Sequence, residues 1–160
     1  HRIRLARHKR AIAQAGEGRF AVPGPHVVPV APQSFMNESG GPVKAIMAFY
    51  GVEPAQMIVV HDELDIPFGA IRAKLGGGDN GHNGLKSIRR AIGTGDFLRV
   101  RVGIGRPPGR QDPAAFVLKP FGSTERAEVP EVMQRAADAV ECLVSDGLES
   151  TQNRFHADPA

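Results

Sequence analysis

Four apolar segments of the chain have patterns typical of β-strands. Val27–Val30 and Met57–Val60 are nearly continuous apolar runs, as expected for strands inside a sheet. Ile71–Leu75 and Phe97–Gly105 alternate between two kinds of residue, which is typical of strands with one buried face. A basic segment near the amino terminus, Leu5–Ala15, can form a further strand.

Apolar residues at helical spacing predict helices that follow two of these strands. The first helix has Asn37 or Ser39 as its N-cap and Gly51 after its last turn. The second begins at its N-cap, Asn83, and ends before Gly93. Both glycines suit the left-handed conformation that commonly ends a helix.

A third, longer helix is predicted over Thr124–Ser145, with Gly147 beyond its end. Strands that alternate with helices favour an α/β fold with three layers. We expect a mixed, mostly parallel twisted sheet flanked by helices, with room for one antiparallel pair. The 160 residues, 41% of them hydrophobic, suit a single domain over residues 1–160.

Composition narrows the class of protein. The one cysteine, Cys142, lies in the pattern of the long helix and is interpreted as a core residue. No apolar run approaches the ~20 residues of a membrane span. The first ten residues, HRIRLARHKR, lack the apolar core of a secretory signal. We therefore expect a soluble, cytoplasmic protein.

The segment Gly76–Gly84, GGGDNGHNG, is predicted to be a binding loop. Its glycines allow the backbone to approach a ligand and to adopt positive φ angles. Asp79, Asn80, His82 and Asn83 add hydrogen-bonding groups, one of which titrates near neutral pH.

Two more polar clusters, Ser34–Gly41 and His61–Asp65, each come just after a predicted strand. In open α/β sheets, ligands bind outside the carboxyl ends of the strands. We therefore expect the two clusters and the glycine loop to line one edge of the sheet.

The segment Arg99–Gly109 holds three arginines and no acidic residue. Within its strand, Arg99 and Arg101 are predicted to lie side by side, opposite the buried face. Such a stripe attracts phosphate, although a solvated strand explains the segment equally well when it is taken alone.

Several common sites lack their motifs. Gly103 and Gly105 lead into prolines, so no helix start is present for a dinucleotide phosphate. No Walker lysine follows the glycine loop. No HExxH motif or cysteine pair supports a metal site, and no nucleophile elbow supports a covalent mechanism. We expect neither a metal nor a cofactor.

The remaining chemistry is hydrolysis or binding by His, Asp and Asn side chains. Asp62 is the best candidate for a carboxylate that orients an imidazole, and amides can hold a carbonyl and its developing oxyanion. Structural roles are open for the same residues: a strand-end acid for Asp62, helix caps for Asn37 and Asn83, and a turn-shaping histidine for His82.

Four motifs, in this order, resemble those of the bacterial type of peptidyl-tRNA hydrolase: FMNESG, HDELD, KLGGGDNGHNGLKSI and FLRVRVGIGRPPGR. The similarity covers about Pro32 to Phe121 and is weaker through Arg154. It implies an esterase that uses water, without metal or cofactor, to free tRNA from a peptide on its 3′ ribose. The implied partner is tRNA, with no DNA or membrane, and the implied enzyme is a cytoplasmic monomer.

The resemblance implies roles for individual residues. Asn37 is similar to the active-site asparagine, with Phe35 beside it as a substrate contact. Asp62 is similar to the acid that supports the catalytic histidine. His82 and Asn83 are similar to the loop pair that contacts substrate near the tRNA 3′ end, and Asn83 is also counted as catalytic.

Lys74 and Arg101 are similar to the family's basic clamp on the terminal phosphate of tRNA, which agrees with the arginine stripe. A non-catalytic RNA-binding homologue that keeps only this clamp is the alternative function. The hydrolase is favoured, because a pure binder has little use for the catalytic residues that remain.

The family opens with a strand, a Gly-Asn-Pro-Gly turn and a Thr-Arg-His-Asn motif that carries the catalytic histidine. None of these motifs occurs here, and neither His1 nor His8 can be assigned that role. We therefore expect a chain truncated at its amino terminus, without the family's first strand, first helix and general base, and with impaired catalysis.

Overall fold

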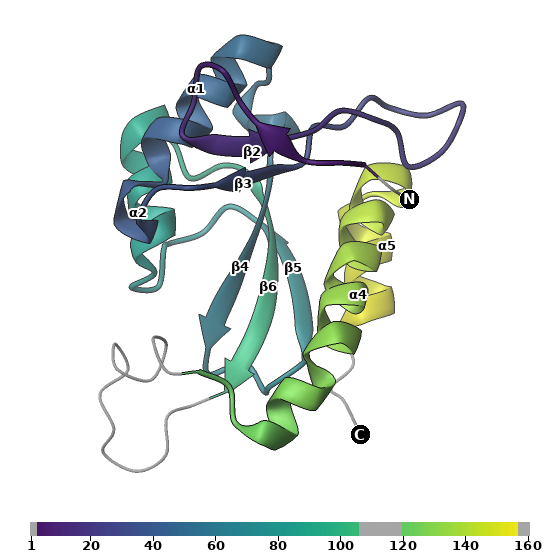
Figure 1. The fold of residues 1–160 in the computed structure, drawn as a ribbon. Coiled ribbons are helices and arrows are strands. Elements are labelled where there is room, and N and C mark those ends of the chain that lie inside the picture. The colour runs from purple at the N-terminus through teal and green to yellow at the C-terminus, as the bar shows by residue number, and fades with distance from the viewer. Residues whose placement is uncertain (1–2, 106–119, 157–160) are drawn as a thin grey trace. The chain divides into compact units, whose positions relative to one another are not determined.

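The computed structural model describes residues 3–105 and 120–156 (Figure 1). The chain divides into two compact units. The first unit consists of His1–Met57 and Gly76–Phe97, and the second of Ile58–Leu75 and Leu98–Ala160. The last part of the arginine-rich motif, after Gly105, lies outside the described residues.

The first unit combines a small antiparallel sheet with helices. Its sheet has the strand order β1-β2-β3, with both pairings antiparallel. The elements are β1 (Ala6–Arg7), β2 (Ala13–Ala15), β3 (Val30–Pro32), the 3-10 helices η1 (Met36–Glu38) and η2 (Pro54–Gln56), and the helices α1 (Gly40–Tyr50) and α2 (Asn83–Ile92).

The predicted amino-terminal strand is two short strands joined by a turn. The N–H of His8 donates to the carbonyl oxygen of Ala13 at 2.9 Å, which closes this hairpin. Alternation along β2 buries Ala13 and Ala15 against Ile46 of α1. The intervening Gln14 is exposed, so the small sheet has one buried and one open face.

The predicted helix ends are confirmed. Gly51 and Gly93 follow α1 and α2 with φ angles of 67° and 80°, in the left-handed region that glycine adopts at little cost.

The predicted helix starts are only partly correct. Ser39 is at the N-cap position of α1, but its hydroxyl donates back to the carbonyl oxygen of Met36 and makes no capping bond. Asn37 lies earlier, in η1. The N-cap of α2 is His82, and Asn83 is the first helical residue.

The second unit combines a three-stranded sheet with two helices. Its strand order is β4-β6-β5, and β6 runs parallel to β4 and antiparallel to β5. In Figure 1, the two helices run alongside the sheet next to β5. The elements are β4 (Ile58–Leu64), β5 (Ile71–Leu75), β6 (Leu98–Gly105), α4 (Ser123–Asp146) and α5 (Leu148–Phe155).

The predicted α/β fold with a mixed sheet flanked by helices is confirmed, but the expectation of a mostly parallel sheet is wrong. Among the strands described, β4 and β6 form the one parallel pair, and the other three pairings are antiparallel. A parallel connection needs a crossover of a dozen or more residues. Six residues separate β4 from β5, so β5 has to run back in the opposite direction.

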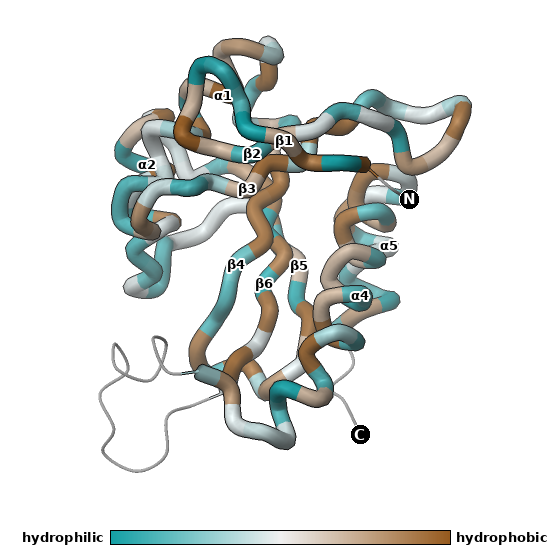
Figure 2. Tube along the Cα trace, viewed as in Figure 1, coloured by the Kyte–Doolittle hydropathy of each residue, from teal (hydrophilic) through white to brown (hydrophobic). Residues whose placement is uncertain are grey.

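The apolar face of this sheet packs on α4 and α5. Alternate residues of β5 and β6 are buried against the helices, and Figure 2 shows hydrophobic and hydrophilic positions alternating along α4. The long helix and the core position of Cys142, which is 3% exposed, are confirmed. The cluster consists of Ile71, Ala73, Val100, Val102, Val132, Ala136, Ala139, Cys142, Leu143 and Phe155.

The opposite face of the sheet does not fit the solvated strand that was one of two interpretations of the arginine-rich segment. Arg99 is 0% exposed and Arg101 is half-buried. Alternation along β6 correctly placed both arginines away from the apolar core, but it carries no information on how much water reaches the polar side. No helix in the described ranges has the length and apolarity that a membrane span requires.

Candidate functional site

The seven candidate residues divide between the two units. Phe35, Asn37, His82 and Asn83 belong to the first unit, and Asp62, Lys74 and Arg101 to the second.

In the first unit, η1 and the start of α2 meet at Gly84. A Cβ atom on this glycine would lie 2.9 Å from Cε1 of His82 and 3.1 Å from Cγ of Met36. Any larger residue at this position would therefore require the side chains of His82 and Met36 to shift. Since Met36 precedes Asn37 and His82 precedes Asn83, the structure brings two of the three polar clusters together.

His82 is held by its place at the start of α2. Its Nδ1 accepts a hydrogen bond from the backbone N–H of Leu85 at 3.2 Å, and its own backbone N–H donates to Asp79 at 2.9 Å. A ring nitrogen that accepts an N–H carries no proton. In the neutral ring the proton is therefore on Nε2, which makes that atom a hydrogen-bond donor.

Asp79 fixes the shape of the glycine loop. One carboxylate oxygen accepts from the backbone N–H of Gly81 at 3.1 Å, and the other lies 3.3 Å from Nη1 of Arg89. Gly76, Gly77 and Gly81 have φ angles of 69°, 94° and 81°, in a region that side chains disfavour. The predicted conformational role of the glycines is confirmed.

The candidate substrate contacts of the first unit lie at the surface. Phe35 is 80% exposed, and Asn37 and Asn83 are also exposed. An aromatic ring can stack on a nucleotide base, and amides both donate and accept hydrogen bonds. The exposed groups near this end of α2 are therefore of the chemical types that can bind an unpaired nucleotide.

In the second unit, the first four residues of the HDELD cluster form the end of β4, whereas the sequence placed the cluster after the strand. The strand continues because residues up to Leu64 pair with β6, as far as Gly105. Successive residues of a strand point to opposite faces. His61 and Glu63, 8% and 7% exposed, therefore share one face, and Asp62, half-buried, lies on the other.

Lys74 and Arg101 lie on the same face of the sheet. Lys74 is opposite Arg99, and Arg72 is opposite Arg101 in the antiparallel pairing of β5 with β6. Lys74 and Arg101 are therefore diagonal neighbours, within reach of a shared ligand. In the parallel pairing of β4 with β6, His61 is aligned with Arg101.

Burial lowers the pKa of both clamp candidates. The pKa of Lys74 is further lowered by the charges of Arg101 and Arg99 and is raised by Glu63. For Arg101, Glu63 raises the pKa and Arg72 lowers it. Several cations, two of them partly buried, near one carboxylate favour the binding of an additional anion.

Asp62 lies on the other face of the sheet from the clamp candidates. It is aligned with Val102, which belongs to the apolar face packed on the helices. The structure thus brings Lys74 and Arg101 together and places Asp62 across the sheet from them.

The sequence interpretation included His61 and Glu63 in a polar cluster but assigned no role to them as a pair. Nδ1 of His61 is 3.6 Å from a carboxylate oxygen of Glu63, and both side chains are buried. The signal was present in the HDELD motif, because a strand over these residues places its first and third members on one face.

Known proteins resemble the chain in sequence and in fold. The family model described as peptidyl-tRNA hydrolase matches residues 1–160. The chain is 63% identical over 154 residues to the peptidyl-tRNA hydrolase of Frankia casuarinae, which covers 96% of this chain and 77% of that protein. It is 55% identical over 150 residues to that of Mycobacterium tuberculosis, covering 94% and 78%.

A crystal structure of peptidyl-tRNA hydrolase from Acinetobacter baumannii matches the chain with a TM-score of 0.85 at 33% identity. The match covers 98% of this chain and 78% of that one. The comparisons show the family over residues 1–160 and do not support the expected loss of the family's first strand and catalytic-histidine motif. That expectation depended on two short motifs and not on the chain as a whole.

Proposed function

Because the chain belongs to the peptidyl-tRNA hydrolase family, we propose that it hydrolyses the ester between the peptide and the 3′ ribose of peptidyl-tRNA. The reaction recycles tRNA from stalled or aborted translation, which takes place in the cytoplasm. The identity of 52–63% to curated hydrolases is the observation that carries the proposal.

Ester hydrolysis requires a base that takes a proton from water and donors that stabilise the oxyanion formed at the carbonyl. We assign the amides of Asn37 and Asn83 to the carbonyl oxygen and the ring of Phe35 to a nucleotide contact. The contact of η1 with the start of α2 at Gly84 supports this grouping.

His82 is assigned to substrate binding and not to proton abstraction. Because its Nδ1 accepts the N–H of Leu85, its Nε2 carries the proton of the neutral ring and can donate to a substrate oxygen. Asp62 is assigned the role of orienting an imidazole base, as the family resemblance implies.

Lys74 and Arg101 are assigned to the terminal phosphate of tRNA. Their shared face and partial burial support this role, because a phosphate interacts more strongly with cations that are partly shielded from water than with fully exposed ones. The proposed active form is a monomer, with tRNA as its partner and neither DNA nor a membrane.

Single-turnover release of peptide from a defined peptidyl-tRNA tests the proposal, with binding of the same tRNA followed in parallel. Release that is lost in Asn37→Ala and kept in Asn153→Ala, an exposed asparagine of α5, supports the hydrolase. Binding without release indicates the non-catalytic RNA-binding alternative. If the chain shows neither binding nor release, both functions are refuted.

A further inference from the structure

The positive charge of the chain is concentrated at one end of its sequence. The first sixteen residues hold five of the 20 Lys and Arg residues and none of the 17 Asp and Glu residues, so the remainder has a formal charge of −2. Most of this basic segment forms β1, β2 and the turn between them. It belongs to the first unit, whereas the clamp candidates Lys74 and Arg101 belong to the second.

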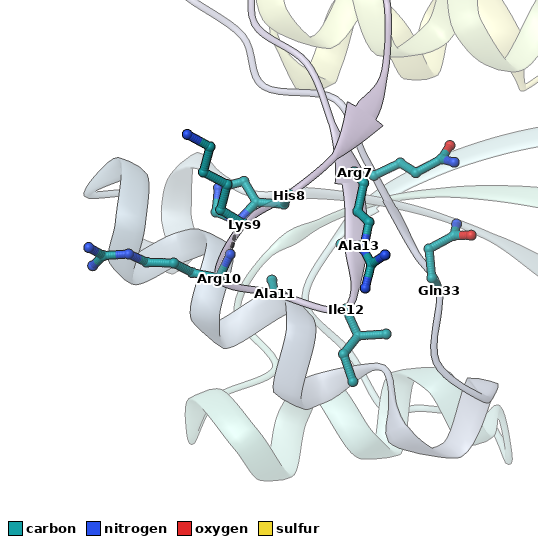
Figure 3. A pocket seen from close by; sticks show the side chains of 9 residues that line it. Arg7, His8, Lys9, Arg10, Ala11, Ile12, Ala13 and Gln33 are labelled. Carbon is teal, nitrogen blue, oxygen red and sulfur yellow. Dashed lines mark hydrogen bonds between the residues drawn. The ribbon is translucent and has the colours of Figure 1, made fainter.

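A groove follows this hairpin, and we call it the hairpin groove (Figure 3). None of the described residues that line it is acidic. In Figure 3, Lys9 and Arg10 extend from the turn, and Arg7 lies on the other side, toward Gln33. The lining residues are Arg7, His8, Lys9, Arg10, Ala11, Ile12, Ala13, Gln14 and Gln33.

Strand pairing places the polar lining on the open face of the small sheet. Arg7 is opposite Gln14, and the N–H of Gln33 donates to Ile12 at 2.9 Å. Arg7, Gln14 and Gln33 are all exposed, while Ala13 is buried on the other face. Cations and amide donors therefore share one accessible surface.

Aromatic contacts anchor the turn on α1. The ring of His8 meets Phe49 edge-on, with centroids 4.7 Å apart, and lies 5.8 Å from Tyr50. Nδ1 of His8 accepts the N–H of Arg10 at 3.1 Å, and the guanidinium of Arg10 is 5.8 Å from the centroid of Phe49. The cations of the turn are thus partly ordered before any ligand arrives, which lowers the entropic cost of binding.

We propose that the hairpin groove binds the sugar-phosphate backbone of the tRNA, at a position other than the acceptor end assigned to Lys74 and Arg101. Exposed Arg and Lys side chains without acids among them attract a polyanion. Amide side chains such as Gln14 and Gln33 bind phosphate and sugar oxygens without reading sequence. The inference rests on the proposed function, which supplies a substrate with many phosphates beyond its reactive end.

Two triple variants test the groove at equal change in net charge. Arg7→Gln/Lys9→Gln/Arg10→Gln removes its cations. Lys44→Gln/Arg90→Gln/Arg126→Gln removes three exposed cations elsewhere and is the control. Each protein is given full-length peptidyl-tRNA and the same peptide esterified to a CCA trinucleotide.

The groove variant should raise the KM for peptidyl-tRNA by about tenfold, the combined effect of three exposed contacts. The dependence of log KM on log salt should weaken by about one unit per cation. Hydrolysis of the trinucleotide ester should not change, because the inference assigns Arg7, Lys9 and Arg10 to phosphates of the tRNA beyond its CCA end. The control variant should behave as the unsubstituted chain on both substrates.

Equal losses on both substrates, or a loss no larger than that of the control, would overturn the groove assignment. If the unsubstituted chain hydrolyses neither substrate, the proposed function fails separately. In that case, the groove assignment is tested by the binding of uncharged tRNA to the groove variant and the control. The groove variant must bind more weakly than the control and with a smaller salt slope, and equal binding rejects the inference.

Discussion

Nε2 of His156 accepts a hydrogen bond from the backbone N–H of Ala73 over 2.8 Å. The carbonyl oxygen of Ala73 accepts from the side-chain amide of Gln152 at 3.1 Å. Within the described sheet β5 is an edge strand, and an edge leaves backbone groups without strand partners. Two side chains at the carboxyl end of α5 thus satisfy Ala73 and hold the strand that carries Lys74.

His156 should make the fold less stable in acid. Its Nε2 can accept only when unprotonated, and burial, followed by the charges of Arg72 and Arg101, lowers its pKa from the ordinary 6.5. Between the two pKa values the unfolded chain binds more protons, so the free energy of unfolding falls as pH decreases from 6.5 to the folded pKa. We expect His156→Gln, which keeps an acceptor but does not titrate, to flatten the dependence of Tm on pH below 6.5.

His26→Gln is the control for that experiment. His26 has a side chain that is 48% exposed and lies 3.4 Å from Glu17 in the first unit, so its loss leaves the hydrogen bond to Ala73 intact. The pH profile of His156→Gln could instead match those of the control and the unsubstituted chain. That result would mean that the pKa of His156 does not change on unfolding.

Gly84→Ala should destabilise the protein, and Gly41→Ala should not. The added methyl at Gly84 would overlap the ring of His82 and the side chain of Met36, at a cost of about 1–3 kcal/mol. The higher helix propensity of alanine stabilises the helix by only about 1 kcal/mol. Gly41 is exposed in α1 with no heavy atom within 4 Å of the added group, so there the propensity gain stands alone.

Urea denaturation of the two glycine variants measures this difference. The midpoint should fall for Gly84→Ala and rise slightly for Gly41→Ala. Shifts of the same sign and size would show that η1 and α2 adjust to the added methyl, and that their contact is not close-packed.

Sequence patterns located the parts of the fold that depend on neighbours along the chain. Ile71–Leu75 coincides with β5, and the helices end at Gly51 and Gly93, as predicted. The end of β4 was misplaced because pairing with a distant segment, β6, continues the strand through polar residues. The burial of Arg99 was missed for a related reason, since alternation distinguishes two faces but does not reveal what covers them.

The candidate site shows the same division. Motifs singled out His82 and its loop because the glycines and the helix start are local features. The pairing of His61 with Glu63 was overlooked, because polar residues in a loop and in a strand look alike until the strand's extent is known. The separation of Asp62 from Lys74 follows only from the register of three strands.

Lys74→Ala and Arg101→Ala should each weaken tRNA binding and reduce its salt dependence. When one phosphate contact is lost, tRNA binding releases about one counterion fewer. The slope of log Kd against log salt should therefore change by about one unit per variant. Arg126→Ala, an exposed cation of α4, is the control and should keep the full slope. An unchanged slope in both clamp variants would reject the assignment.

Asn83→Ala should lower kcat without lowering stability. The side chain of an N-cap residue contributes about 0.5–2 kcal/mol, but the N-cap of α2 is His82, and Asn83 is the exposed first helical residue. A purely structural role for its amide therefore predicts little effect of any kind. A role in binding the oxyanion predicts a loss of about 10²–10³ in kcat.

Single-turnover rates and thermal melts of Asn83→Ala and the control Asn153→Ala separate the structural role from the catalytic one. A fall in Tm that accounts for the lost activity would return Asn83 to a structural role, and an unchanged kcat would remove it from the active site.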